Sequence, residues 1–393
     1  MRLSRLKPLL VIASGGSALF AGHAIYYGNP KFYAHAVMPT IHRFTAAETA
    51  HNLAISCAKR GLYPKCTDVN KDNLNISVLG KMFLNPIGLS AGFDKHCEAI
   101  TGLLGFGFGF IEVGGVTPEP QPGNELPRVF RLKEDMAIIN RYGFNSCGHD
   151  VAVARFKRWF SLKEREETSG FVGVNLGKNK TTTDAVADYV KGVQAFGRMA
   201  DFLVVNISSP NTPGLRKLQG REQLEQIVDA VVEARDKLTD GVKPPILIKI
   251  APDLTEKDKV DIATVVTAKN SGIDGLIVSN TTVTRSSDLI SSNKVEVGGL
   301  SGQPLKALST QTIKDMYKLT AGKVVIIGVG GVFNGADAFE KIKAGASLVQ
   351  IYTSLAYLGP PVVNQIKQEL SDLLEKEGYN NISQAVGVDV LSG

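Results

Sequence analysis

Asparagine, serine and threonine side chains gather in the segment Asn-Ile-Ser-Ser-Pro-Asn-Thr at residues 206–212. The proline stiffens the turn that carries them. Because an asparagine offers both an N–H donor and a C=O acceptor, Asn206 and Asn211 suit a neutral planar ring with alternating N–H and C=O groups. Lys95 and Lys249 can supply positive charge beside a carboxylate. The alternative interpretation is a stiff turn that binds nothing.

Glycines late in the chain suggest a phosphate site. Gly328-Val-Gly-Gly331 and Tyr352-Thr353-Ser354 each end an apolar run, and Gly302 offers a further backbone donor. Backbone N–H groups at glycine turns and helix N-termini attract phosphate. The competing interpretation is that these glycines only permit tight turns.

Several kinds of chemistry are disfavoured by what the chain lacks. All six histidines fall within the first 149 residues, so the later segments contain no histidine base. The four cysteines form no C-x-x-C pair and have no histidine at zinc spacing, so they are interpreted as reduced thiols and no metal site is expected. No P-loop, H-E-x-x-H or G-x-S-x-G motif occurs.

The net charge of +6 is concentrated at the amino terminus. Residues 1–47 hold five basic side chains and no acidic one, which leaves 39 basic and 38 acidic side chains in the other 346 residues. A nearly neutral body argues against a nucleic-acid partner.

The first 30 residues predict a targeting sequence with a membrane helix. Residues 1–7 are cationic, and residues 8–27 contain no Asp, Glu, Lys or Arg. A helix of that length reaches about 30 Å, enough to cross a bilayer once. Three interpretations compete: a mitochondrial targeting sequence followed by a retained anchor, a cleaved secretory signal, and a cleaved transit peptide. The acid-free basic start favours mitochondria.

Residues 31–68 predict a pair of short helices. Pro39 is expected to separate them, Thr45 and Glu48 have the spacing of a capping box, and Gly61 is expected to stop the second helix. The apolar face of that helix either packs on the main domain or lies at a membrane surface and shapes an access route for a lipophilic ligand.

Residues 69–393 contain no linker or repeat, and predict a (β/α)8 barrel. Eight short apolar runs recur without polar alternation, as in strands covered on both faces, and most are followed by a helix-like stretch. Three long connections, residues 115–170, 209–221 and 281–302, are candidate lids over the carboxyl ends of the strands. The runs are residues 86–92, 108–114, 171–177, 202–208, 246–251, 275–280, 324–331 and 348–353.

Taken together, these features resemble the membrane-bound, quinone-reducing class of dihydroorotate dehydrogenases over nearly the whole chain. Each motif alone is weak, but seven in order on a barrel are specific. The motifs are Ala91-Gly-Phe-Asp-Lys95, Asn140-Arg-Tyr-Gly-Phe-Asn145, Asn175-Leu-Gly-Lys-Asn-Lys180, residues 206–212, Ser279-Asn-Thr281, Gly299-Leu-Ser-Gly302 and Gly328-Val-Gly-Gly331.

The resemblance implies a flavoenzyme that oxidises dihydroorotate to orotate, the fourth step of pyrimidine synthesis, and reduces ubiquinone at the mitochondrial inner membrane. Ser209 would be the base that takes the C5 proton while a hydride leaves C6 for the flavin, with Thr212 and a water as relays. The residues implied to hold FMN are Ala91, Gly92, Gly115, Asn175, Asn206, Lys249, Ser279, Gly302, Gly331, Tyr352 and Thr353. Those implied for the substrate are Lys95, Asn140, Arg141, Tyr142, Gly143, Phe144, Asn206, Asn211, Asn280 and Thr281, and those for the quinone are His51, Arg131 and Tyr352.

Two positions depart from the family pattern. Gly115 stands where members often carry a hydroxyl near the flavin, and His42 stands where a tunnel glutamine is common. Two other functions are kept open. One is an FMN barrel of the 2-hydroxy-acid oxidase kind, which resembles the chain less because its late histidine base has no counterpart. The other is a membrane-tethered barrel that binds a ligand without catalysis.

Overall fold

A closed barrel of eight parallel strands forms the body of the molecule in the computed structural model, which describes residues 3–66, 69–166, 170–239, 241 and 243–391. The spatial order is β10, β12, β13, β3, β4, β7, β8, β9. The predicted barrel is confirmed, because each apolar run forms one strand. The strands are β3 (Ile87–Leu89), β4 (Phe110–Val116), β7 (Phe171–Leu176), β8 (Phe202–Asn206), β9 (Ile246–Ile250), β10 (Gly275–Val278), β12 (Val325–Val329) and β13 (Leu348–Ile351).

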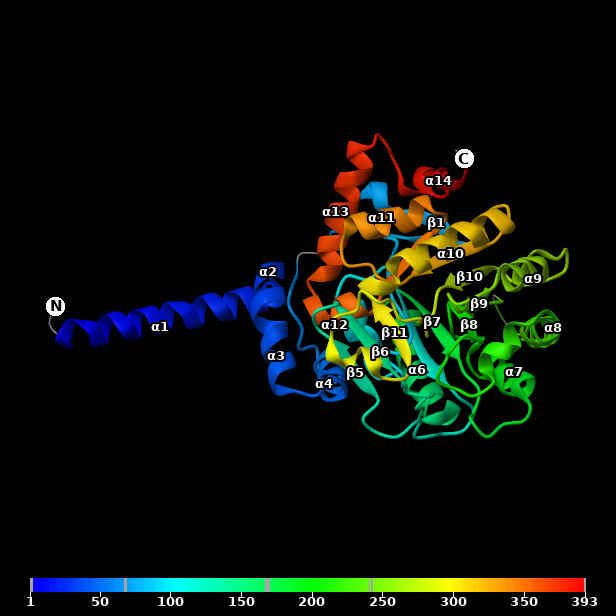
Figure 1. Cartoon of the computed structure of the whole chain (residues 1–393), viewed down its shortest axis with the longest axis horizontal. Helices are drawn as coiled ribbons and strands as arrows, with labels where there is room; N and C mark the ends of the chain where they lie inside the picture. The colour runs from blue at the N-terminus through cyan, green and yellow to red at the C-terminus, as the bar shows by residue number, and fades with distance from the viewer. Residues whose placement is uncertain (1–2, 67–68, 167–169, 240, 242, 392–393) are drawn as a thin grey trace.

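The strands are apolar throughout because both of their faces are covered. Every residue of β8 and β9 is buried, with one face toward the barrel interior and the other toward the helices. In this register Asn206 lies beside Lys249, so the polar ends of neighbouring strands meet at one rim. The surrounding helices are α5 (Ile100–Leu104), α6 (Gly148–Glu164), α7 (Ala185–Phe196), α8 (Arg221–Asp236), α9 (Glu256–Thr267), α10 (Lys306–Leu319), α11 (Gly335–Lys343), α12 (Thr353–Leu358) and α13 (Val362–Lys376) (Figure 1).

Smaller elements close the two ends of the barrel. The hairpin of β1 (Ile76–Val78) and β2 (Lys81–Phe83) covers the amino-terminal end, where the Phe83 ring contacts those of Phe110 and Phe171. At the opposite end β5 (Val129–Leu132), β6 (Ala137–Asn140) and β11 (Gly299–Gly302) form an antiparallel sheet. We call residues 117–147, which carry β5 and β6, the lid. The remaining short helices are η2 (Asp72–Leu74), η3 (Leu215–Gln219), η4 (Ser292–Val295), η5 (Gln303–Leu305), η6 (Ile382–Ala385) and α14 (Val388–Leu391).

The amino-terminal segment is helical from residue 3 onward. Helix α1 (Leu3–Tyr26) extends away from the rest of the molecule, and α2 (Pro30–Phe32), the π-helix η1 (Tyr33–Val37), α3 (Met38–Phe44) and α4 (Ala47–Lys59) bring the chain to the barrel (Figure 1). No helix within the described ranges combines the length and the apolar character needed to cross a membrane. Residues 1–2, at the basic start, and residues 67–68, at the expected end of the helical pair, lie outside the described residues.

Two local expectations for residues 31–64 are wrong. Pro39 does not separate the helices, because it lies in the first turn of α3, where a missing N–H costs little; the break comes at Thr45. Thr45 and Glu48 form no capping box, since the Thr45 hydroxyl donates to the Ile41 carbonyl and the Glu48 carboxylate accepts from Arg128. The expected stop is confirmed, with α4 ending at Lys59 just before Gly61.

Candidate active site

A cavity of about 750 Å³ opens at the carboxyl end of the barrel and continues beneath α3 and α4. Ser209 and the other residues predicted to bind cofactor, substrate or quinone line this cavity, except Arg141. Thr212, the predicted relay, is not among the lining residues. The Arg141 side chain instead donates to the Glu296 carboxylate at 2.7 Å and to the carbonyls of Val297 and Pro127. The polar strand ends are therefore brought together as the barrel topology predicts.

Glu112 anchors the floor of the cavity. This residue of β4 is fully buried, and its carboxylate accepts from Asn175 Nδ2 at 2.6 Å, Gln350 Nε2 at 2.9 Å and Lys249 Nζ at 3.3 Å. The backbone N–H of Ala91 is a fourth donor, at 3.3 Å. Because a buried carboxylate is stable only when its oxygens are satisfied, these bonds fix the three side chains at the floor.

A chain of amides runs from this floor across the strand ends. Asn175 Oδ1 accepts from Asn206 Nδ2 at 3.0 Å, and Asn206 Oδ1 accepts from Asn280 Nδ2 at 3.4 Å. Asn280 also donates to the Ser208 hydroxyl at 3.1 Å. Since each amide is held by its neighbour, the network orients donors and acceptors along one wall of the cavity.

Ser209 lies on the loop after β8, partly buried at the cavity wall. Its Oγ accepts a hydrogen bond from the backbone N–H of Asn211 at 3.3 Å. Asn211 Nδ2 in turn donates to Asn140 Oδ1 on β6 at 3.3 Å. The hydroxyl of Thr212 is buried without a hydrogen-bond partner among the described residues. The loop thus presents one positioned hydroxyl and one unsatisfied hydroxyl.

Lys95 brings a cation to the same cavity. Its Nζ lies 3.8 Å from the centre of the Tyr142 ring. Burial lowers the pKa of Lys95 to about 7, while the nearby Glu48 raises it and Arg128 lowers it. A desolvated ammonium held by an aromatic face is a suitable counter-ion for a ligand carboxylate.

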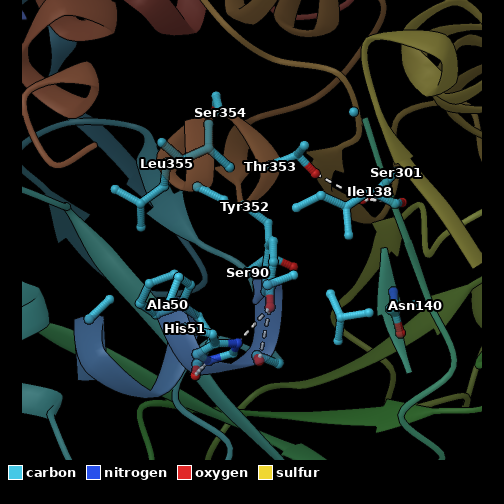
Figure 2. Close-up of a pocket in the computed structure, with 18 of the residues that line it drawn as sticks. Ala50, His51, Ser90, Ile138, Asn140, Ser301, Tyr352, Thr353, Ser354 and Leu355 are labelled. Carbon is cyan, nitrogen blue, oxygen red and sulfur yellow. Dashed lines mark hydrogen bonds between the residues drawn. The ribbon is translucent and has the colours of Figure 1, made fainter. Parts of the chain in front are cut away.

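His51 stands where the polar part of the cavity meets the part beneath the helices. Its Nε2–H donates to the Phe93 carbonyl at 2.6 Å, so Nδ1 is an acceptor, 3.4 Å from the hydroxyls of Tyr142 and Tyr352. Burial lowers the pKa of His51 to about 3, which keeps the ring neutral. Figure 2 shows His51 beside Tyr352, with Asn140 across the cavity from them.

Arg131 lines the part of the cavity beneath α3 and α4. Its guanidinium donates to the carbonyls of Thr45 at 2.8 Å and Ala46 at 3.3 Å, at the turn between the two helices. The neighbouring His42 donates through Nε2 to the Ala356 carbonyl at 2.9 Å, and burial lowers its pKa to about 4. We call this part of the cavity, beneath α3 and α4, the arm. Its other lining residues include the apolar side chains Met38, Ile41, Ala50, Leu53 and Ala54.

The glycine turns and the start of α12 form the opposite end of the cavity. Gly302, Gly331 and Thr353 line it together, and Ser301 Oγ lies 2.8 Å from Thr353 Oγ1 (Figure 2). A Cβ on Gly331 would come within 2.5 Å of Lys306, in a backbone with φ of +72° that favours glycine. The turn therefore requires glycine, and its backbone stays open to the cavity.

Sequence reasoning missed several residues that position this site, among them Glu112, Gln350, Ser90, Glu48 and Arg128. Glu112 and Gln350 carried a usable signal, since each is a polar residue inside an otherwise apolar strand run. Such a residue must find buried partners in a barrel interior. The spacing of Glu48 from Thr45 suggested a helix cap and not a contact with the lid. Arg128 lies in a long irregular connection, where no local pattern indicates its partner.

Comparison with known proteins agrees with this geometry. The model of the family described as "Dihydroorotate dehydrogenase" matches residues 73–374. A mouse (Mus musculus) protein named "Dihydroorotate dehydrogenase (quinone), mitochondrial" is 53% identical over 380 residues, which cover 96% of each chain. An Arabidopsis thaliana protein of the same name is 50% identical over 402 residues, covering 97% of this chain and 86% of its own.

Solved structures show the same relationship. The crystal structure of an Eimeria tenella DHODH in complex with ferulenol has a TM-score of 0.85 and 44% identity, and the match covers 87% of this chain and 95% of that one. The ligand-free Eimeria tenella structure gives a TM-score of 0.84 at 45% identity, covering 88% and 99%. With most of the chain matched by the family model and by relatives well above 30% identity, this protein belongs to the dihydroorotate dehydrogenase family.

Proposed function

We propose that this protein oxidises dihydroorotate to orotate, the fourth step of pyrimidine synthesis, with FMN as its cofactor and ubiquinone as the final electron acceptor. The observation that carries the proposal is one continuous cavity with three different regions. A polar wall of amides with Ser209 and Lys95 suits the substrate, the glycine turns suit a phosphate, and an arm beneath α3 and α4 suits a lipophilic quinone.

The residues at the floor and the glycine turns fit FMN. Gln350 Oε1 and Ser354 Oγ are buried in the cavity lining without hydrogen-bond partners among the described residues, as expected of groups that meet a polar ligand. When bound, FMN accepts a hydride from the substrate and passes electrons to the quinone. We assign its binding to Ala91, Gly92, Gly115, Asn175, Asn206, Lys249, Ser279, Gly302, Gly331, Tyr352 and Thr353.

The glycine at position 115 has a steric reason. A Cβ there would lie 2.8 Å from the Phe144 ring and 3.0 Å from Asn175 Oδ1. The hydroxyl that other members often carry is therefore replaced by a close approach of backbone to the lid. Beside Gly115, the polar side chain is then that of Asn175, which Glu112 holds in place.

The substrate ring is assigned to the amide wall, and its carboxylate to Lys95. Asn140 and Asn211 face it from the lid and the β8 loop, while Asn206, Asn280 and Thr281 complete the wall. Tyr142, Gly143 and Phe144 line the same region from the lid. Arg141 stays part of this assignment only as a residue that fixes the lid, since its side chain pairs with Glu296 outside the cavity.

Ser209 is assigned as the base that takes the proton from C5. The Asn211 N–H donates to Ser209 Oγ, which stabilises negative charge as the hydroxyl proton leaves. A serine hydroxyl is a poor base on its own, so its proton must move on to a relay. We assign the relay to a water molecule and to the Thr212 hydroxyl, which is buried and has no hydrogen-bond partner among the described residues.

The quinone is assigned to the arm lined by His51, Arg131 and Tyr352. Neutral His51 and the Tyr352 hydroxyl provide hydrogen-bonding groups at its inner end, and apolar side chains of α3 and α4 line the rest. Residues 31–68 thus serve as the quinone-side segment. Position 42 carries a histidine that donates to the Ala356 carbonyl, so it offers no free Nε2–H to a quinone.

Mitochondrial location is the further part of the proposal. Two of the relatives described above are named mitochondrial. Helix α1 extends from the body and exposes large apolar side chains, with Leu19 78% and Phe20 63% exposed (Figure 1). We assign this helix to association with the inner membrane, next to the quinone pool.

Anaerobic mixing tests the proposal directly. Dihydroorotate should bleach the flavin absorbance of the purified holoenzyme, and a water-soluble ubiquinone analogue should restore it. Lactate or glycolate, substrates of the 2-hydroxy-acid oxidase kind, should leave the spectrum unchanged. A protein that carries no flavin, or a flavin that dihydroorotate does not bleach, would contradict the proposed function.

A further inference from the structure

We propose that Glu48 and Arg128 are positioning residues for dihydroorotate, because their ion pair fastens α4 to the lid and so sets the geometry of the substrate end of the cavity. The inference rests on the proposed function for the identity of the ligand. It gives α4, assigned above to the quinone side, a second role at the substrate.

The ion pair has the geometry of a strong one. Arg128 Nε lies 3.2 Å from both carboxylate oxygens of Glu48, and Nη2 lies 2.8 Å from Oε1. The side chains are only 12% and 22% exposed. A forked contact that is mostly shielded from water is worth more than an exposed pair between flexible side chains.

Arg128 also organises the lid around itself. Its remaining nitrogen, Nη1, donates to the carbonyls of Pro122 at 2.7 Å and Asn124 at 2.9 Å. All three guanidinium nitrogens are therefore used, one side toward α4 and the other toward the lid backbone. A lysine in this position would present a point charge and could not hold both.

From Asn124 the contacts continue to the loop that carries Ser209. Asn124 Nδ2 donates to the carbonyls of Arg141 at 3.0 Å and Asn211 at 3.2 Å. The N–H of Asn211 is the group that donates to Ser209 Oγ. An unbroken series of hydrogen bonds and backbone links thus joins Glu48 on α4 to the proposed base.

Tyr142 provides a second connection between α4 and the substrate end. The Arg128 guanidinium lies 5.3 Å from the centre of its ring, and Lys95 Nζ lies 3.8 Å from it. The Tyr142 hydroxyl meets His51 Nδ1 at 3.4 Å. Because His51 follows Glu48 by three residues, both lie on the same face of α4. Helix α4 therefore meets this tyrosine at its hydroxyl through His51, and at its ring through Arg128, the partner of Glu48.

The test compares Glu48→Gln, Arg128→Gln and the double variant with the wild-type holoenzyme. Orotate affinity is measured by titration of the flavin absorbance, and KM values are measured for dihydroorotate and for the quinone analogue. We expect each single variant to bind orotate about tenfold more weakly, and the double variant to be no worse than either single one. FMN content should stay at one per chain.

Lys59→Gln is the matched control, since Lys59 also joins α4 to the barrel, through an ion pair with Glu98 at 3.5 Å. It should bind orotate as the wild type does. Arg128→Lys should recover only part of the lost affinity, which separates the forked geometry from charge alone. This conservative variant also carries the test if Arg128→Gln does not fold.

The results separate the two proposals. Normal orotate affinity in Glu48→Gln, or a loss equal to that in Lys59→Gln, would overturn the positioning role. A rise in quinone KM alone would do the same, because it would confine α4 to the quinone side. Failure of dihydroorotate to bleach the wild-type flavin would instead overturn the proposed function, whatever the variants do.

Discussion

Ser209 is the residue on which the proposed chemistry depends most directly. Replacing it with alanine removes the proposed proton acceptor, while Ser209 is not among the residues assigned to FMN. Flavin reduction by dihydroorotate should slow by on the order of 10²–10⁴-fold, the usual contribution of a positioned base. Stopped-flow absorbance under anaerobic conditions measures this rate. Ser209→Cys should retain part of it, and an alanine variant that reduces its flavin at the wild-type rate would remove Ser209 from the role of base.

Lys95 predicts a pH dependence of ligand binding. Its pKa is lowered to about 7 by burial, and a bound carboxylate should raise it again. Above pH 7 the free enzyme has lost this proton while the complex keeps it, so binding must take up a proton. The Kd for orotate should therefore be lowest below pH 7 and rise by up to about tenfold per pH unit above it. A Lys95→Gln variant should bind weakly with a flat profile; a flat profile in the wild type would contradict the prediction.

Replacing Glu112 should lower both the stability of the fold and the affinity for FMN. Four donors share the two carboxylate oxygens of Glu112. In Glu112→Gln one of these oxygens becomes an –NH₂ group, which cannot accept, so at least one donor loses its partner. An unsatisfied buried group costs about 1–3 kcal/mol, and the floor should hold FMN less well. Urea unfolding and the Kd for FMN measure both effects. Glu256→Gln on the exposed surface of α9 is the control, and equal behaviour of the two variants would refute the anchoring role.

At the scale of elements, we propose that α1 serves membrane association and that the segment from α2 to α4 serves the cavity. Helix α1 exposes apolar side chains, while Glu48 and His51 of α4 contact the lid and the loop after β3. A chain lacking residues 1–28 should lose membrane association and still reduce its flavin with dihydroorotate. Flotation on liposomes with inner-membrane lipids and anaerobic bleaching measure the two properties. Continued flotation would assign the membrane contact to α2–α4 instead.

The elements that sequence predicts best are those whose burial is uniform. The eight barrel strands follow from unbroken apolar runs, because both faces of a parallel strand are covered. The region around Pro39 and Thr45 was predicted less well, since local rules for helix breaks and caps compete there with tertiary contacts to Arg128 and Arg131. Residues such as Arg128 act through partners 80 positions away, and no local pattern encodes that pairing.

At the scale of the whole molecule, the cavity is built from both ends of the chain. The amino-terminal helices supply His51, and the lid supplies Asn140. The last strand supplies Gln350, and Tyr352 follows it directly. Because β13 pairs with β3 in the barrel, residues far apart in sequence line the same wall of the cavity. A ligand that fills this cavity therefore contacts most parts of the fold at once, which links its binding to global stability.

Removal of FMN should consequently destabilise the entire barrel. The buried Gln350 Oε1 and Ser354 Oγ have no hydrogen-bond partner within the part of the chain that the structure describes, so a bound ligand can supply one. A cofactor that binds only the folded state stabilises that state. Stabilisation grows with free FMN and reaches about 2.7 kcal/mol at 100 times Kd, so Tm should rise steadily with its concentration. Calorimetry of the apoenzyme with added FMN measures the slope, and riboflavin tests the glycine turns because it lacks the phosphate. The riboflavin series should show a smaller rise at equal concentration; identical slopes would remove Gly302, Gly331 and Thr353 from phosphate binding.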